Sequence, residues 1–432
     1  MAFDPEEFKA RREARERERK AKQERQRKTL ISLGIAAGVL LVCIAVILLL
    51  PSRSNSSETV PTEPVSTDPS ISTEATELLP STEASPNDPT TVIHFTAAGD
   101  LNINDTVVSA GSFSYDYSLA FQDVVPVLSQ ANLTTLNLEG NLVGAPYGSQ
   151  TASAPQTMMQ ALHDAGVDMI QLANSYSIHN GMGGLVSTMR SVRNAGMEPL
   201  GVYESNAAFK EGKGYSIRNV QGVKIALVAF TKGMDGLALP AGNEKCVNVL
   251  YKDYESTYQS VNTAGITSVL NAVSKENPDI TIALLHWGSE FNDTISSTQK
   301  SICSLMLQNG VDAIIGTHPH YVQQISYDQE AGTLIAYSLG DFFSDAQRAG
   351  SEYSIVLDLE ITKDNRTGTT RITNYSYTPI FSVVEEGKLP RVVRIAEAML
   401  AYENLYIDRV TEDTYDDMAY ALKRIEARVK GE

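Results

Sequence analysis

Two short motifs contain three of the six histidines in this chain of 432 residues. His286 follows an apolar stretch in LLHWG, and His318 and His320 flank a proline in GTHPH. A single histidine beside an apolar run is as often a packed core residue as a ligand. Alternate histidines around a proline, by contrast, hold their imidazoles in fixed directions and have little use in packing. Because imidazole binds Mn, Fe and Zn, the two motifs predict a metal site.

Two carboxylates belong to the same pattern. Asp100 follows the apolar segment VIHFTAAG, and Glu139 ends the segment LTTLNLE. An aspartate after a glycine is on its own usually a turn or a helix cap, and a lone glutamate is equally uninformative. Two carboxylates with three imidazoles, however, make a ligand set for one or two divalent ions, which polarise a substrate and generate hydroxide near neutral pH. The sequence leaves the identity of the metal open.

Short apolar strands alternate with helical stretches after Thr91. We expect strands at VIHFTAAG, LTTLNL, MIQLA, KIALVAF, ITIALLHW, AIIG and LIAYSLG. We expect helices at SYDYSLAFQDVVPVLSQ, APQTMMQALHDAG, LVSTMRSVRNAG and STQKSICSLMLQNG, the last three ending at Gly166, Gly196 and Gly310. This alternation predicts an α/β fold, in which ligands bind beyond the carboxyl ends of the strands. A β-hairpin over residues 353–378 and two amphipathic helices after Pro390 complete the prediction.

The order and wording of these motifs resemble the CapA family of poly-γ-glutamate capsule synthesis. The resemblance covers about residues 92–385 and rests on AAGD, ANLTTLNLEGNL, LANSYSIHNGMGGLVSTMRSVRNAGMEPLGVY, GVKIALVAFT, LLHWGSEF, QNGVDAIIGTHPHYVQ and IAYSLGDFF. It implies a four-layer α/β/β/α sandwich of the calcineurin-like metallophosphoesterase type over residues 91–385. The amphipathic helices predicted after Pro390 make residues 386–432 a C-terminal helical extension. The resemblance also implies a role in making, attaching or trimming an anionic envelope polymer.

The resemblance assigns roles to individual residues. The family's metal ligands correspond here to Asp100, Glu139, His286, His318 and His320. Asp341 stands where the family motif YSLGNF has its asparagine. Together with Trp287, it is expected to contact the substrate.

One segment departs from the family pattern. Family members usually read ANNH with an aspartate three residues later, whereas this chain has Asn174, Ser175 and Tyr176 after Ala173, and His179 in place of the aspartate. Asn174 is expected to bind metal, and Tyr176 or His179 to protonate the leaving group. Since serine is a poor metal ligand and a phenol of pKa about 10 is a reluctant acid, a site that only binds its ligand stays open.

The first 90 residues predict a membrane anchor. Residues 29–50, TLISLGIAAGVLLVCIAVILLL, contain no charge and are long enough to span a hydrocarbon core of about 30 Å. A cleaved signal peptide is the rival interpretation, but its apolar region would be shorter and would end in a small-residue cleavage site. The basic residues 1–28 place the N-terminus in the cytoplasm and the main domain outside. Residues 51–90, rich in Ser, Thr and Pro, are expected to form a disordered tether.

The formal net charge of −17 restricts the choice of partners. An acidic surface repels phosphate backbones, so we expect no nucleic-acid partner. It also repels an anionic polymer, and attraction must then come from metal ions or from local cations. Candidates for such cations are Lys232, Lys245 and Arg348.

Cysteine use carries little information. Of the three cysteines, Cys43 lies in the apolar segment, which leaves Cys246 and Cys303 as the only pair that could form a disulfide outside the cell. We interpret both as unpaired core residues, the commoner role of free cysteine, with the disulfide left open.

Two functions stay open. The first is a membrane-anchored, extracytoplasmic hydrolase or transferase that uses divalent metal on a poly-γ-glutamate-type polymer, alongside other membrane proteins of capsule synthesis. The second is a catalytically degenerate module that binds the polymer or scaffolds the machinery. Absence of bound metal would exclude the first, and turnover that depends on Asp100 or His318 would exclude the second.

Overall fold

The computed structural model describes residues 88–346, 348–404 and 410–432. The predicted cytoplasmic segment, transmembrane helix and almost all of the tether therefore lie outside the described residues. Among the described residues, no helix combines the length and apolarity needed to cross a membrane.

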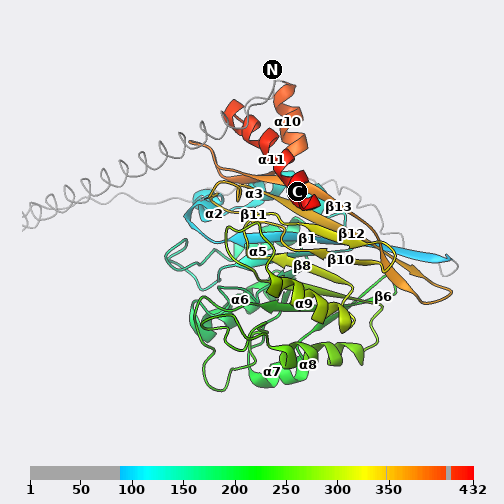
Figure 1. Ribbon diagram of the computed structural model, residues 1–432. Coiled ribbons are helices and arrows are strands. Elements are labelled where there is room, and N and C mark those ends of the chain that lie inside the picture. The colour runs from blue at the N-terminus through cyan, green and yellow to red at the C-terminus, as the bar shows by residue number, and fades with distance from the viewer. Residues whose placement is uncertain (1–87, 347, 405–409) are drawn as a thin grey trace, which may run out of the picture. The chain divides into compact units, whose positions relative to one another are not determined.

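Two β-sheets form the centre of the described chain (Figure 1). The first sheet has eight strands in the order β14-β13-β12-β1-β2-β3-β4, with β11 paired to β1. Its strands are β1 (Thr90–Asn102), β2 (Leu133–Glu139), β3 (Met169–Gln171), β4 (Glu198–Leu200), β11 (Asp341–Phe343), β12 (Tyr353–Asp364), β13 (Thr370–Val383) and β14 (Arg391–Arg394). β1, β2, β3 and β4 are parallel to one another, and β11 is parallel to β1. β12 is antiparallel to both β1 and β13, and β13 is antiparallel to β14.

The second sheet has six strands in the order β5-β6-β7-β8-β10-β9. They are β5 (Ser216–Val220), β6 (Val223–Thr231), β7 (Ile280–His286), β8 (Ala313–Thr317), β9 (Ile325–Asp328) and β10 (Thr333–Ala336). β6, β7 and β8 are parallel neighbours whose carboxyl ends are in register at Thr231, His286 and Thr317.

Successive residues of the central strands belong alternately to two hydrophobic cores, one on each face of the second sheet. On β6, Ile225 and Leu227 belong to the large core shared with the first sheet, whereas Ala226 and Val228 belong to a second core. Successive residues of a strand point to opposite faces, so a sheet buried on both sides reads as a continuous apolar run. This explains why KIALVAF and ITIALLHW have no polar alternation.

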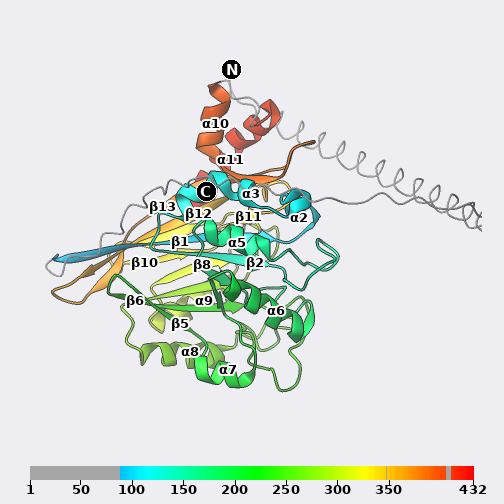
Figure 2. The ribbon, with the colours of Figure 1, turned by 180° about the vertical axis from the view of Figure 1, so that it is seen from behind.

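Helices cover the outer faces of the sheets. α8 (Thr263–Ser274) and α9 (Ser297–Gln308) contribute to the second core, on the six-stranded sheet. α5 (Thr157–Asp164) and α6 (Gly181–Asn194) contribute to the large core, and α6 contacts β4 (Figure 2). The remaining short helices in this part are α2 (Asp105–Ser109), η1 (Ser112–Ser114), α3 (Ser118–Phe121), η2 (Gln122–Val124), α4 (Val125–Leu128) and α7 (Asn206–Gly212).

The predicted helix ends are confirmed, but one predicted helix is wrong. Gly166, Gly196 and Gly310 follow α5, α6 and α9 with positive φ, a backbone conformation that glycine adopts without steric cost. The expected continuous helix over residues 114–130 is instead divided into α3, η2 and α4. Pro126 lies in the first turn of α4, where its missing N–H costs no hydrogen bond, and so begins a new helix.

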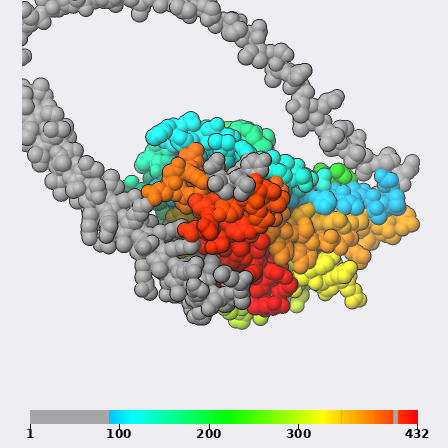
Figure 3. All heavy atoms as spheres, turned by 90° about the horizontal axis from the view of Figure 1, so that it is seen from above, coloured from blue at the N-terminus to red at the C-terminus, as the bar shows by residue number. Residues whose placement is uncertain are grey.

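The predicted hairpin is confirmed by the antiparallel pairing of β12 with β13. β14 then extends the first sheet, and α10 (Ile395–Glu403) and α11 (Glu412–Lys430) pack on β12, β13 and β14 (Figure 3). The C-terminal segment thus shares the core of the main domain through Met418, Ala421 and Ile425.

The two cysteines within the described residues are buried and unpaired. Cys246 belongs to the large core and Cys303 to the second core. Because the six-stranded sheet separates these cores, the structure favours the interpretation of both as packed side chains.

Candidate metal centre

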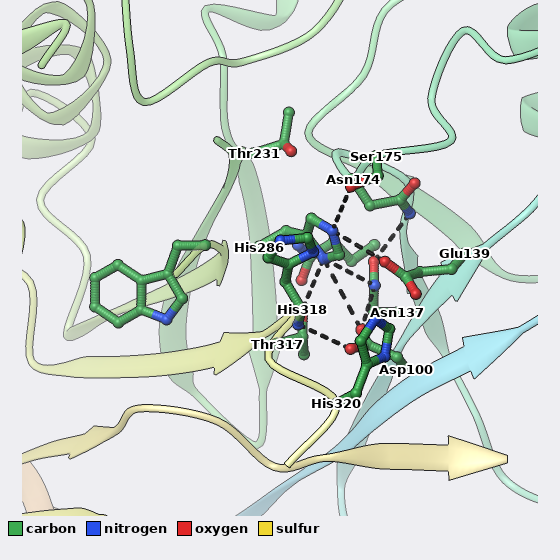
Figure 4. A network of polar contacts seen from close by, with 12 residues as sticks. Asp100, Asn137, Glu139, Asn174, Ser175, Thr231, His286, Thr317, His318 and His320 are labelled. Carbon is green, nitrogen blue, oxygen red and sulfur yellow. Dashed lines mark hydrogen bonds and ion pairs between the residues drawn. The ribbon is translucent and has the colours of Figure 1, made fainter. Parts of the chain in front are cut away.

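The five predicted ligands converge where the parallel strands of the two sheets end (Figure 4). Asp100 lies near the end of β1, Glu139 at the end of β2 and His286 at the end of β7, while His318 and His320 follow β8. Their exposed fractions run only from 0% for Asp100 and His286 to 8% for His320. Ionisable side chains are rarely buried together without compensating partners, so the cluster requires a chemical explanation.

Asp100 lies at a bulge in β1. The register between β1 and β2 shifts between Ala97 and Asp100, which re-aims the strand end. Oδ1 of Asp100 accepts a hydrogen bond of 2.6 Å from the Asn137 amide, and Oδ2 accepts one of 2.8 Å from the backbone N–H of His318. The aspartate therefore connects the strand ends of both sheets.

His286 lies between a carboxylate and two hydroxyls. Its Nε2 is 3.0 Å from Oε1 of Glu139 and 3.1 Å from Oγ of Ser175, and its Nδ1 is 3.1 Å from Oγ1 of Thr317. Complete burial, the largest effect, lowers the pKa of His286 to about 3. The imidazole is therefore neutral at physiological pH, the form that can bind metal.

The histidines of GTHPH have positive φ, 93° for His318 and 59° for His320. A histidine at such angles is uncommon, and strained backbone tends to gather at functional sites. Nδ1 of His320 lies 2.7 Å from Oδ1 of Asp341. Burial opposes the charged form of His320, but Asp341, Glu139 and Asp100 outweigh it and raise its pKa to about 11.

The two carboxylates are held in an environment that disfavours their charge. Burial, followed by the nearby Glu139, raises the pKa of Asp100 to about 7. Burial likewise raises the pKa of Glu139 to about 8. Burial is also the main cause that brings the pKa of His318 well below its usual value. Perturbed groups in one cluster are typical of functional sites.

The residues fit a divalent metal. Oε2 of Glu139 and Nδ1 of His318 are buried and have no hydrogen-bond partner among the described residues. Such orphaned atoms cost about 1–3 kcal/mol each, and both are atoms that ligate divalent ions. Three sets of side chains bring one ligand atom each to within 4.8 Å of one another: Glu139, His286 and His318; Asp100, Glu139 and His320; and Glu290, His318 and His320. Glu139, His318 and His320 each belong to two of the three sets, so the sets lie next to one another.

The segment after β3 lies beside this cluster. Asn174 donates to Oδ1 of Asn137 over 3.0 Å and to the Leu138 carbonyl over 2.6 Å, and its own Oδ1 accepts from the Tyr176 backbone N–H. The amide thus supports the strand ends in this arrangement, and its predicted part in metal binding stays a prediction.

Tyr176 and His179 lie next to one another, with ring centroids 5.4 Å apart. Burial, aided by Glu139, raises the pKa of the Tyr176 phenol to about 12, so the phenol stays protonated at neutral pH. His179 is exposed. Proton donation by either residue stays a prediction.

Asp341 supports a ligand. Its side chain is 3% exposed and pairs with His320, and its backbone lies opposite Asp100 in the β1–β11 pair. A carboxylate that holds a ligating histidine fixes the orientation of the ring. The geometry thus gives Asp341 a positioning contact with His320, and its contact with substrate stays a prediction.

The expectation that Trp287 contacts the substrate is wrong. Trp287 is wholly buried in the second core, stacks with Tyr337, and donates its indole N–H to the Tyr337 carbonyl over 2.9 Å. Adjacent residues of a strand point to opposite faces, so the neighbour of His286 leaves the site.

This burial predicts the fluorescence of the protein. Trp287 is the single tryptophan of the chain, so the emission of the native protein is expected to be blue-shifted and weakly quenched by acrylamide. Unfolding in urea should shift the emission to the red and make quenching efficient. Emission of the native chain that acrylamide quenches as strongly as the unfolded chain would contradict the packing described here.

Sequence reasoning missed several neighbours of the cluster. Asn137 and Thr317 make the polar contacts already described, and Glu290 belongs to one of the three ligand sets. Asn137 lies in LTTLNLE, Thr317 in GTHPH and Glu290 in LLHWGSEF. Their place in the same motifs as the predicted ligands is the signal by which the sequence could have shown them. Of the three candidate cations, Lys232 contacts the cluster directly, with Nζ 3.0 Å from Nε2 of His318.

Comparison with known proteins identifies the family. Residues 94–346, more than half of the chain, match the family model described as bacterial capsule synthesis protein PGA_cap. The capsule biosynthesis protein CapA of Bacillus anthracis is 26% identical over 294 residues, which are 64% of this chain and 67% of that protein. The PGA biosynthesis protein CapA of Bacillus subtilis is 27% identical over 258 residues, which are 59% of this chain and 63% of that protein. The chain belongs to this family of bacterial capsule synthesis proteins.

Similar solved structures include phosphoesterases. A calcineurin-like phosphoesterase, YfkN, of Bacillus subtilis is 14% identical, with a TM-score of 0.43 and coverage of 77% of this chain and 100% of its own. A phosphatase of Mycoplasma pneumoniae is also 14% identical, with a TM-score of 0.38 and coverage of 67% and 94%.

Proposed function

We propose that this chain is a membrane-anchored, extracytoplasmic protein that uses a divalent metal centre on a poly-γ-glutamate-type capsule polymer, as a hydrolase or transferase with a metallophosphoesterase-like layered fold. The observation that carries the proposal is the buried cluster of Asp100, Glu139, His286 and His318. In it, a carboxylate oxygen and an imidazole nitrogen find no hydrogen-bond partner in the described parts of the chain. The capsule polymer is proposed as the substrate because the chain belongs to a family of bacterial capsule synthesis proteins.

The ligands are proposed to hold Mn, Fe or Zn. Such an ion, when bound, polarises a carbonyl or phosphoryl oxygen and lowers the pKa of water. The protein groups around it hold the ligands in place: Asn137 orients Asp100, and Asp341 orients His320. The protonated Tyr176 phenol is suited to donate a hydrogen bond to charge that develops on the substrate.

Elemental analysis of the purified full chain tests the proposal. We expect about one or two equivalents of divalent metal per chain, and a loss of nearly all of it in the double variant His318→Ala/His320→Ala, because two imidazole ligands disappear. The matched control is His94→Ala/His163→Ala, which removes two histidines outside the cluster and should keep the metal. A wild-type chain that neither contains nor takes up Mn, Fe or Zn would exclude the metal centre.

The altered segment after β3 favours a second candidate, a binding or scaffold protein without catalysis. Nε2 of His286 contacts the hydroxyl of Ser175, whereas the family pattern ANNH has an asparagine, a better metal ligand, at this position. The two candidates differ in turnover. Metal-dependent cleavage or transfer of poly-γ-glutamate that vanishes in folded Asp100→Ala would exclude the binding role.

The proposed location and partners follow from the sequence and the family. The apolar residues 29–50 anchor the chain, the acidic domain stands outside the membrane, and other capsule-synthesis membrane proteins are its proposed neighbours, without nucleic acid. Protease added to intact cells should remove the domain while leaving the N-terminal segment protected. Full protection of the domain in intact cells, with cleavage after lysis, would contradict this topology.

A further inference from the structure

Lys232 follows β6 and directs its ammonium group toward the metal-ligand cluster. Nζ lies 3.0 Å from Nε2 of His318 and 3.1 Å from the Gly288 carbonyl, to which it donates, and 4.7 Å from the centre of the Tyr258 ring. The side chain is half-buried. It is therefore held in one place, beside the atoms that we propose bind metal.

Lys232 forms no direct ion pair within the part of the chain that the structure describes. No described carboxylate lies within 4.0 Å of its Nζ, although the chain is strongly acidic. Lys363, by comparison, lies 2.7 Å from Asp279 in an ordinary ion pair. Glu290 and Asp235 attract the Lys232 ammonium from a greater distance. Because it forms no ion pair with a described carboxylate, the ammonium is available to an anion that enters the site.

Metal binding would change the environment of Lys232. In the present contact, Nε2 of His318 accepts from the ammonium, which places the ring proton on Nδ1. A metal ion on Nε2 would take this lone pair directly. A metal ion on Nδ1 would move the ring proton to Nε2, which could then no longer accept. Either way the ammonium loses His318 as an acceptor once the centre is loaded and requires another.

We propose that Lys232 is a substrate-positioning residue, which binds an anionic oxygen of the substrate, carboxylate or phosphoryl, next to the metal centre and becomes free to do so when metal binds. The inference rests on the proposed metal centre and adds a residue that binds the anionic group of the substrate. It also resolves how an acidic domain handles an acidic polymer, because attraction is supplied locally by the metal ion and this ammonium.

A second cation lies near the same ligands. The guanidinium carbon of Arg348 is 4.2 Å from the centre of the Phe291 ring, and this ring stacks on His320 at 4.8 Å. Arg348 is exposed. It is suited to meet a neighbouring carboxylate of a polymer whose reacting group lies at Lys232.

Binding measurements on the full chain test the proposal. The probes are a fluorescent γ-linked glutamate oligomer, followed by anisotropy, and inorganic phosphate as its competitor, each with and without Mn²⁺. We expect Mn²⁺ to raise the affinity of the wild-type chain, and Lys232→Met to lower affinity in Mn²⁺ by roughly tenfold or more, because a charge-assisted contact is lost. Lys232→Arg should restore part of it. Displacement of the oligomer by phosphate would indicate a phosphoryl-binding site, and its absence a carboxylate-binding site.

Lys245→Met is the matched control. Lys245 is also a lysine over an aromatic ring, 5.5 Å from the centre of Phe209, but it makes no described contact with the cluster, and its replacement should change affinity less than about twofold. Metal content is measured on every variant, so failure of the metal centre is seen separately as a wild-type chain without metal. Equal affinity of the wild-type chain and Lys232→Met for both probes would overturn the inference, and so would a wild-type chain that binds neither.

Discussion

Replacing Gly99 with alanine is expected to destabilise the folded chain by about 3 kcal/mol or more. A Cβ at this position would lie 1.8 Å from the Gly340 carbonyl oxygen and 2.9 Å from its carbon, both backbone atoms that no rotamer change can move. The neighbouring Asp100 N–H donates to the same oxygen over 3.0 Å. The substitution therefore forces β1 away from β11 at the residue that begins the metal-ligand set.

Urea unfolding followed by Trp287 fluorescence measures this effect. Gly183→Ala is the matched control, because Gly183 lies exposed within α6 and a Cβ there would meet nothing within 4 Å. It should stabilise the chain by roughly 0.5–1 kcal/mol, the usual gain in a helix interior. If Gly99→Ala unfolds at the wild-type urea concentration, the close approach of β1 to Gly340 is not present in the protein.

The second large effect is a loss of stability of the metal-free chain as pH rises from about 7 to 8. The folded-state pKa values of Asp100 and Glu139 are raised to about 7 and about 8, so both carboxyls hold protons that the unfolded chain has already released. The pKa of His320 is raised to about 11, so its stabilising charge is fully present below pH 6.5 and is lost towards pH 11. In each case the folded state binds more protons than the unfolded state does. The free energy of unfolding therefore falls as pH rises, by a few kcal/mol in total between pH 7 and pH 8.

Two histidines set the lower limit of this pH window. The pKa values of His286 and His318 are lowered in the folded state, so below about pH 6.5 these residues make stability rise with pH. Above about pH 6.5 both are neutral in the folded and the unfolded state and have no effect. Saturating divalent metal should largely remove the decline, because its charge compensates the ionised carboxylates. The measurement is the urea midpoint at pH 7 and pH 8, with chelator and with Mn²⁺. A metal-free midpoint that stays constant or rises would contradict the burial of these carboxylates.

Much of the fold could be predicted from the sequence because its signals are local. Continuous apolar runs such as KIALVAF mark strands buried on both faces, and glycines after helical stretches mark helix ends. Parallel strands bring their carboxyl ends to the same edge of a sheet, so Asp100 could be expected near Glu139, and His286 near the residues that follow β8.

Errors arose where a contact depends on which face of an element meets which neighbour. Trp287 adjoins His286 in sequence, but a strand turns successive side chains to opposite faces, and the indole enters the second core. The helix expected over residues 114–130 divides into shorter elements, the last of which begins around Pro126. The pairing of Asp341 with His320 could not be predicted either, because it depends on β11 lying opposite Asp100.

The sequence by itself therefore determined the family, the α/β class and the identity of the five main ligand candidates, because these depend on residue types, order and strand-end position. Only the tertiary structure decided which ligand atoms lack described partners, which carboxyl groups have pKa values raised by burial, and that Lys232 lies at His318. These properties depend on distances of a few ångströms between segments up to 218 residues apart, as in the contact of His318 with Asp100. Distances of that kind are set by how the two sheets pack.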